Sequence, residues 1–554
     1  MPNPVYNLSH YLRRLPLRII HSSARCGAII ALLLTGISLF SQTSNFDGKS
    51  WWDYVKVLAD DNMEGRDTGS PGLQRAQAYV IEQLKKDGIQ PAGDKGYYQP
   101  IKFISRRLDE SKSSLALTHD GKTEALVLGD DAILSTRIEA APQVDAPLVF
   151  VGYGLRVPEM QIDDLAGLDV KNKVLVVFAG SPEQMSAALS AHYQSTAMRS
   201  KVLKDTGALG YIMLPNPAAM DIPWERIKTS RLHPSMGYAD KSMDESAPAQ
   251  ISVYFNPASA PKLFEGTGHT FDEIAALGKD RKPLPHFALN KEIQARQTLI
   301  KQEVESANLV GKLVGSDPKL KNEYVVLSAH LDHLGIGEPI NGDKIYNGAM
   351  DNGSGSALLL DMAAALPKLN PKRSVLFVWV TGEEKGLLGS HYFAAHPTVP
   401  MKSMVANINT DMFLPIVPLK ILTVYGLAES DLGDDVEEVA KQDGVAVQPD
   451  PEPLRNLFIR SDQYSFVRDG IPAIAMKVGF EKGSPEEKLN QQWLHDRYHA
   501  PSDDLNQPVD LAAAGKFEDV VRDLTIKVAD DAQRPEWKTT SFFRRFENNQ
   551  AQGK

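Results

Sequence analysis

The chain has 554 residues, too many for one ordinary domain, and its 42% hydrophobic and 23% charged content is typical of a soluble globular protein. Its net charge of -10 argues against nucleic acid or an anionic membrane surface as a partner. The single cysteine, Cys26, lies near the N-terminus, which excludes disulfides and thiolate metal ligands from the rest of the chain. Any bound metal ion must therefore be held by His, Asp and Glu.

The first 44 residues have the pattern of an export signal. Four arginines precede an apolar run over residues 27–40, and small polar residues follow at 41–44. We predict a cleaved signal peptide over 1–44 and a periplasmic or extracellular protein with a net charge of -14. The apolar run is short for a membrane span, and an uncleaved N-terminal anchor is the alternative.

The next two segments differ in character. Residues 45–125 begin with a helical apolar period over 51–84, which the Gly- and Pro-rich segment EGRDTGSPG (64–72) interrupts. Over 126–285 short β-like runs alternate with Pro- and Gly-rich connections, with one helical stretch at 186–207. We expect 126–285 to be an independent β-rich domain inserted into a second domain that begins at 45.

Strands and helices alternate from residue 286 to 534, and a polar tail follows at 535–554. This alternation predicts an α/β domain with a mixed, largely parallel sheet flanked by helices, whose functional groups lie at the carboxyl ends of the strands. We expect strands at 307–315, 323–330, 374–382, 404–411, 419–426 and 471–478, and helices at 354–369, 385–396, 431–444 and within 511–531.

The adjacent carboxylates Glu383 and Glu384 end the strand VLFVWV. Like charges this close raise each other's pKa, so the pair needs a proton or a cation. Other candidate ligands end or follow neighbouring strands. They are His330 and Asp332 after EYVVLSA, Asp351 in a Gly-rich turn before a helix, Asp411 after ANINT and His499 in the loop RYHAPSDD. Such nitrogen and oxygen ligands suit zinc, with cobalt or manganese as alternatives.

Each residue also has a simpler interpretation when it is taken alone. Asp351 could cap a helix, Asp411 could be a turn residue, and His499 could be an exposed loop histidine. Asp332 and His333 could be polar loop residues. Their joint occurrence in order at successive strand ends favours a site for two ions that share one carboxylate and a water. Because residues two apart in a strand point to one side, Asp332 is expected to hydrogen-bond the far nitrogen of His330.

Five motifs, HLD, GAMDNGSG, GEEKGLLGS, NTDM and YHAPSD, resemble in sequence and order the co-catalytic zinc exopeptidases of metallopeptidase family 28. The resemblance covers most of the chain after Ser306 and includes EGRDTGSPG, and the inserted segment looks like a protease-associated domain. It implies two Zn²⁺ ions, the first held by His330, Asp351 and Asp411 and the second by Asp351, Glu384 and His499. It further implies Glu383 as general base, Asp332 as the partner of His330, and a cis peptide bond between Asp351 and Asn352.

The resemblance implies hydrolysis of peptides, most simply by an aminopeptidase whose metal-rich rim meets a free α-amine. A carboxypeptidase of the glutamate carboxypeptidase type is the alternative, with Arg455 and Arg460 as candidates to receive a substrate carboxylate. Ser461 and Asp462 resemble a family segment that flanks the substrate pocket. Glutaminyl cyclases and non-catalytic receptors are further alternatives. We expect no stable membrane partner, and a homodimer is left open.

Overall fold

The computed structural model describes residues 46–552 except 221, 247 and 456, so the predicted signal peptide or anchor lies outside the described residues. Within these residues, no helix combines the length and the apolar character that a bilayer crossing requires.

The larger of the two main sheets is mixed, as predicted. Its four central strands, β18, β15, β19 and β22, run parallel, and antiparallel pairs flank them on both sides. The parallel region is thus narrower than the alternating sequence pattern suggests. In spatial order the strands are β11 (Ser235–Tyr238), β2 (Tyr98–Leu108), β14 (Leu299–Leu313), β18 (Ser374–Val380), β15 (Tyr324–His330), β19 (Met404–Asn409), β22 (Ala473–Val478), β20 (Ile421–Tyr425) and β21 (Ala446–Gln448), with β1 (Gln90–Pro91) paired to β14.

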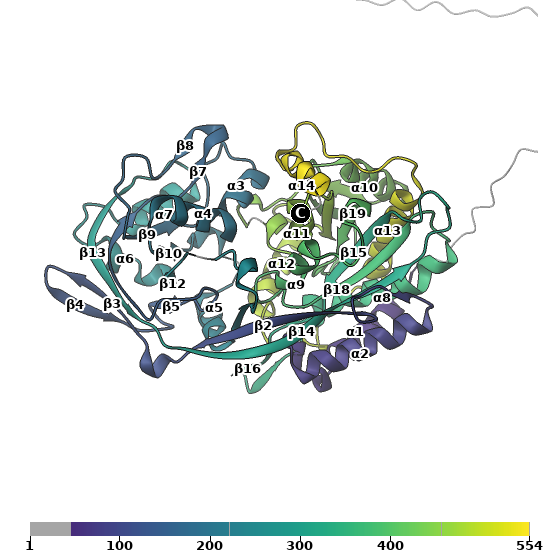
Figure 1. The fold of residues 1–554 in the computed structure, drawn as a ribbon, viewed down its shortest axis with the longest axis horizontal. Helices are drawn as coiled ribbons and strands as arrows, with labels where there is room; N and C mark the ends of the chain where they lie inside the picture. Colours follow the sequence, from purple (N-terminus) through teal and green to yellow (C-terminus); the bar gives the residue numbers. More distant parts are fainter. Residues whose placement is uncertain (1–45, 221, 247, 456, 553–554) are drawn as a thin grey trace, which may run out of the picture. The chain divides into compact units, whose positions relative to one another are not determined.

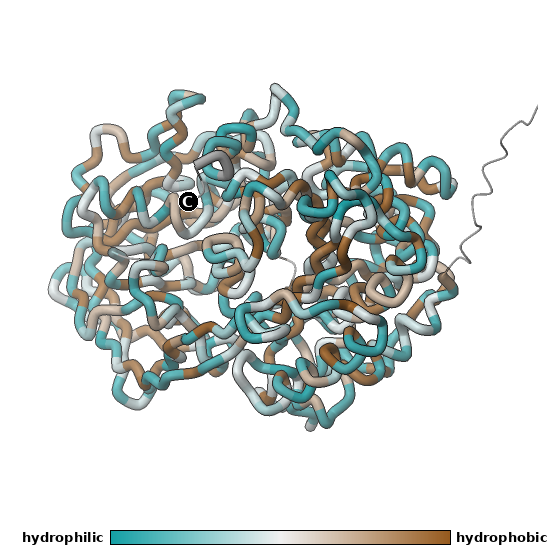
Figure 2. Tube along the Cα trace, turned by 45° about the vertical axis from the view of Figure 1, so that its right-hand side comes forward, coloured by the Kyte–Doolittle hydropathy of each residue, from teal (hydrophilic) through white to brown (hydrophobic). Residues whose placement is uncertain are grey.

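Helices cover both faces of this sheet. Alternate residues of β15 pack to opposite sides, with Val325 and Leu327 in one apolar cluster and Val326 in another. The first cluster includes residues of α1 (Lys49–Leu58), α2 (Pro71–Lys86), α8 (Ser354–Ala365), α10 (Asp431–Gln442) and α13 (Leu511–Asp530), and the second those of α9 (Leu388–Ala395) and α11 (Gln463–Arg468). In Figure 2 hydrophobic stretches follow the inner strands and hydrophilic ones follow the outer turns.

A second sheet has its own apolar core, to which β6, β9, β12 and β13 contribute most of the strand residues. Its strands in spatial order are β4 (Lys122–Leu126), β3 (Ser114–His119), β13 (Phe287–Arg296), β6 (Gln143–Phe150), β9 (Val174–Phe178), β10 (Gly210–Leu214), β12 (Ile251–Phe255) and β5 (Ala132–Leu134). Helices α3 (Ala187–Gln194), α4 (Thr196–Thr206), α5 (Trp224–Ile227), α6 (Pro261–Phe264) and α7 (Phe271–Lys279) accompany it. The sheet extends beyond residues 126–285 at both ends, and the domain boundaries stay predictions.

The long strands β2 and β14 connect the regions of the two sheets (Figure 1). They pair antiparallel without interruption from Tyr98↔Leu309 to Leu108↔Leu299. Strand β11, from within the predicted insert, pairs with the outer edge of β2. Smaller elements are the hairpin β16 (Gly335–Ile340) and β17 (Asp343–Tyr346), the pair β7 (Arg156–Val157) and β8 (Ile162–Asp163), α12 (Pro485–Asp496) and α14 (Glu547–Gln552).

Candidate metal centre

The predicted site residues come together at the carboxyl edge of the parallel strands. His330 is the last residue of β15, Glu383 and Glu384 lie in the turn after β18, and Asp411 follows β19. These three strands are adjacent and parallel, so their ends meet at one edge. Asp351 lies in the turn before α8, and His499 lies in the connection from α12 to α13. The topology therefore explains how residues far apart in the chain form one cluster.

Asp351 lies between two groups of candidate ligands. Its Oδ1 is 3.3 Å from Nε2 of His330, and that nitrogen is 3.4 Å from Oδ1 of Asp411. Its Oδ2 is 3.1 Å from Nε2 of His499, which is 3.3 Å from Oε2 of Glu384. Each oxygen of one carboxylate thus faces a different histidine, as a carboxylate shared by two ions requires.

His333, for which the sequence suggests no role beyond that of a polar loop residue, also belongs to this cluster. Its side chain is fully buried. Its Nδ1 lies 2.8 Å from Oε1 of Glu384 and 3.9 Å from Oδ2 of Asp351, and the three residues form a group compact enough to hold one ion. The spacing HLDH gave no reason to choose His333, because one added residue after a strand end does not fix where a side chain points.

Buried polar atoms at the site fit a metal ion. Nδ1 of His333 and Oε1 of Glu384 lie 2.8 Å apart, and within the described residues neither these atoms nor Nε2 of His333 has a partner with hydrogen-bonding geometry. Buried polar atoms without a partner are costly, and a cation between them would satisfy both kinds of ligand. Two histidines, or three with His333, and carboxylate oxygens without sulfur are the donors that zinc accepts.

The adjacent carboxylates Glu383 and Glu384 have opposite pKa shifts. Burial opposes ionisation of Glu384, but His499 and His333 together lower its pKa to about 2. Burial raises the pKa of Glu383 well above its ordinary value, and the charge of Glu384 adds to this shift although His330 opposes it. Neighbouring groups with divergent pKa values are the arrangement from which acid–base roles are assigned.

The turn that carries Asp351 is held by buried charged groups. The Asp351–Asn352 peptide bond is cis, as predicted. Oδ1 of Asp503 accepts a hydrogen bond from the Met350 amide at 2.9 Å, and its Oδ2 accepts from the Asp351 amide at 3.0 Å. Arg66, from the segment EGRDTGSPG, is fully buried. Its guanidinium joins three separate stretches of chain, because it donates to the main-chain carbonyls of Leu58, of Leu331, and of the neighbours Asn347 and Gly348.

The structure corrects the expected contact between Asp332 and His330. Nδ1 of His330 is 3.0 Å from the main-chain carbonyl oxygen of Asp332, so the imidazole is oriented by the backbone. The carboxylate of Asp332 instead accepts hydrogen bonds from the Thr68 hydroxyl at 2.8 Å and from the Glu383 amide at 3.2 Å. The chain turns directly after β15 ends at His330, and the alternation of side chains on which the prediction relied ends there too.

Two arginines of the predicted insert reach the backbone beside the candidate ligands. Arg137 donates to the carbonyl of Glu384 at 3.1 Å. Arg226, in α5, donates to the carbonyl of Tyr498 at 3.0 Å and to those of Leu494 and Asp496 at 3.5 and 3.4 Å. The loop that carries His499 is therefore held from the side of the insert.

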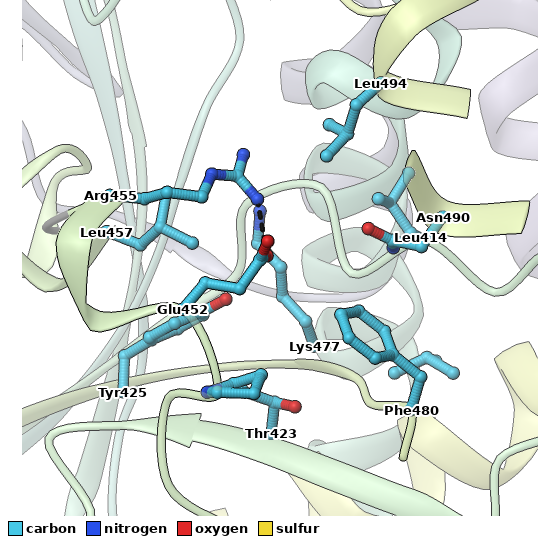
Figure 3. A pocket seen from close by; sticks show the side chains of 12 residues that line it. Leu414, Thr423, Tyr425, Glu452, Arg455, Leu457, Lys477, Phe480, Asn490 and Leu494 are labelled. Atoms are coloured by element: carbon cyan, nitrogen blue, oxygen red, sulfur yellow. Dashed lines mark hydrogen bonds and ion pairs between the residues drawn. The ribbon is translucent and has the colours of Figure 1, made fainter. Parts of the chain in front are cut away.

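A cavity of about 630 Å³ opens beside this cluster, and residues of the insert line it together with Glu384 and His499. Arg455 and Arg460 also line it. Arg455 faces a second cavity of about 30 Å³ as well, where its guanidinium forms an ion pair with Glu452 at 2.7 Å (Figure 3).

Comparison with known proteins identifies the family. Residues 308–525 match the family model described as Peptidase family M28. This part of the chain belongs to peptidase family M28. The M28 segment contains His330, Asp351, Glu383, Glu384, Asp411 and His499.

Similar proteins include aminopeptidases. The chain is 26% identical over 266 residues to Aminopeptidase Y of Saccharomyces cerevisiae, which is 44% of this chain and 43% of that protein. It is 30% identical over 213 residues to the probable leucine aminopeptidase 2 of Aspergillus oryzae, 36% and 40% of the two chains. The chain thus spans less than half the length of these curated relatives. An aminopeptidase from Aneurinibacillus sp. strain AM-1 shares the fold, with a TM-score of 0.54 at 19% identity over 88% of this chain and 96% of that chain.

Proposed function

We propose that this M28 peptidase is an exported zinc aminopeptidase that holds two Zn²⁺ ions and uses Glu383 as its general base. The observation that carries the proposal is Asp351, whose two oxygens face His330 and His499 respectively. His330 and Asp411 would hold the first ion with Asp351, and Glu384 and His499 would hold the second with it. His333 is a further candidate ligand beside Glu384. The export signal at 1–44 and the protease-associated character of the insert belong to the same proposal.

The bound ions would polarise the scissile carbonyl and make a water molecule acidic enough to deprotonate near neutral pH. Glu383 is the carboxylate not used in either ligand set. It would take the proton from that water and later deliver it to the leaving amine. The main chain orients it, because the Glu383 amide donates to the buried carboxylate of Asp332.

An aminopeptidase is favoured because carboxylates crowd the candidate ligands and would attract a free α-amine, and because named relatives are aminopeptidases. The competing function is a carboxypeptidase, which Arg460 in the cavity lining would serve.

Paired substrates separate the two functions. We expect the purified protein to release the first residue of Leu-Gly-Gly and to leave N-acetyl-Leu-Gly-Gly intact. Chelation should abolish the activity, and added Zn²⁺ should restore it with two ions per chain by elemental analysis. Cleavage of the acetylated peptide alone would instead establish the carboxypeptidase.

A further inference from the structure

The lining of the 630 Å³ cavity has a charge opposite to that of the chain as a whole. The protein carries a net charge of -10. Among the described lining residues, however, the only acidic residue is Glu384, against six cationic ones: Arg137, Arg226, Arg231, Lys385, Arg455 and Arg460. A cavity with walls of one sign attracts ligands of the other sign. This inversion needs an explanation that the metal cluster does not provide.

Part of this charge is compensated by carboxylates outside the lining. Arg231 pairs with Glu110 at 2.8 Å, Lys385 with Asp67 at 2.7 Å, and Arg455 with Glu452. The hydrogen bonds of Arg137 and Arg226 described above go to main-chain carbonyls, which carry no formal charge to neutralise them. Within the described residues neither Arg137 nor Arg226 forms an ion pair, although the charge of Asp496 acts on Arg226, so positive charge lies beside the candidate ligands.

The position of these arginines indicates which part of a substrate they would meet. Arg137 contacts the main chain of Glu384, and Arg226 contacts that of Tyr498, the residue before His499. An extended peptide advances ~3.4 Å per residue, so groups one or two residues from the cleaved bond would lie along this wall. A guanidinium binds a carboxylate through two parallel hydrogen bonds, which suits it to this group better than to a neutral amide.

We propose that the cavity binds a carboxylate of the substrate, so that the enzyme prefers short peptides with a free C-terminus or peptides with an acidic residue near the cleaved bond. This preference rests on the proposed peptidase function. The insert, which supplies Arg137, Arg226 and Arg231, would then set the specificity, and the M28 segment would supply the hydrolysis.

The test compares substrates that differ only in one carboxylate. Leu-Leu and Leu-Leu-amide test the C-terminal carboxylate, and Leu-Glu-amide and Leu-Gln-amide test an acidic side chain. We expect kcat/KM to be at least about tenfold higher for the charged member of one pair, equivalent to about 1.4 kcal/mol. The preference should shrink as added salt screens the arginines.

Variants assign the effect to the cavity wall. Arg137→Gln and Arg460→Gln should each reduce the preference at least about threefold, whereas Arg137→Lys should retain most of it. Arg156→Gln is the matched control, because Arg156 pairs with Asp163 elsewhere in the insert and does not line the cavity. Zinc content measured on every variant distinguishes lost recognition from lost metal.

The outcomes separate this inference from the proposed function. If the neutral amides are cleaved as fast as the charged peptides, the peptidase stands and the carboxylate site is wrong. A preference that is unchanged in both glutamine variants would also overturn the site. If no peptide is cleaved at all by the zinc-loaded protein, the proposed function itself fails.

Discussion

Two identical side chains next to each other behave differently because their surroundings differ. Glu384 faces the imidazoles of His333 and His499, which favour its ionised form. Glu383 is half-buried, and desolvation and the neighbouring carboxylates disfavour its charged form although His330 opposes them. Adjacent positions in one turn can therefore place a candidate metal ligand next to a candidate for proton exchange.

Glu383→Gln tests this separation at the level of one atom. The substitution removes the proton acceptor and keeps the size of the side chain, so we expect turnover to fall at least ~100-fold while two zinc ions remain bound. Steady-state kinetics and elemental analysis measure the two effects, and Glu303→Gln on the exposed part of β14 serves as the control. Normal turnover in Glu383→Gln would exclude the role, and loss of zinc would make Glu383 a ligand.

Residue-level prediction from the sequence worked where motifs and strand ends agreed. The order of His330, Asp351, Glu384, Asp411 and His499 along the chain was enough to predict that they meet, and the structure brings them together. The missed contacts depend on three-dimensional packing. The hydrogen bonds of Asp503 to the turn at 350–351 span about 150 residues of chain, and no local pattern records them.

Elements with a strong apolar period were predicted well, and those held by tertiary contacts were not. Helix α8 and strand β18 are buried along most or all of their length and stand out in the sequence. The hairpin β16–β17 was missed although Asn341 and Gly342 both have positive φ and form an Asn-Gly turn, a recognised hairpin signal. Its strands are short and only two of their residues are buried, so apolar alternation does not mark them.

The packing of α13 against α8 buries a carboxyl group that should make the stability of the fold depend on pH. Glu518 of α13 is fully buried beside the carboxyl group of Asp361 of α8. Burial, and next the charge of Asp361 of α8, raise its pKa well above the ordinary value of 4.5. The folded state therefore holds a proton that the unfolded chain releases. The contribution of Glu518 to the free energy of unfolding should therefore be greatest below pH 4.5. It should fall as the pH rises towards the raised pKa.

Glu518→Gln should flatten this dependence, because the amide needs no proton to stay neutral. Urea unfolding of the metal-free protein at a series of pH values from 5 to 9 measures the effect. The control is Glu437→Gln, at an exposed site of α10. Across this range the free energy of unfolding should fall more for wild type and for the control than for Glu518→Gln. If the three curves run parallel, the buried carboxyl is not the source of the pH dependence.

At the level of the whole molecule, the insert supports the loop that carries a predicted metal ligand. Removing the bonds from Arg226 to the carbonyls of Leu494, Asp496 and Tyr498 should loosen His499. We expect Arg226→Ala to release one of the two zinc ions to a chelator about tenfold faster than wild type, the lower end of the effect of groups that orient ligands. Arg156→Ala, in the same insert, should not change the rate. Equal release rates in all three proteins would show that the loop holds His499 by itself.

The change in sequence character near residues 126 and 285 predicts a β-rich unit, and the structure has a second sheet there that extends beyond these bounds. The strands that connect the two sheets were not predictable. Strands β2 and β14 pair across nearly 200 residues of chain, and their alternation of polar and apolar residues gives no sign of which partner they choose. The register of such a pair depends on which faces of both strands are buried in the folded protein.

The pairing of β2 with β14 makes the second sheet, in terms of chain connectivity, the loop of a hairpin. The pairing of the two strands ends at Leu108 and Leu299. Directly beyond it, the amide of Asp109 donates to the carbonyl of Thr298 at 2.8 Å. A two-residue turn at this point could replace everything between. The natural place to cut, fuse or exchange the insert is therefore 109–298. Such a minimal chain would have to protect the edge of β2 that β11 now covers.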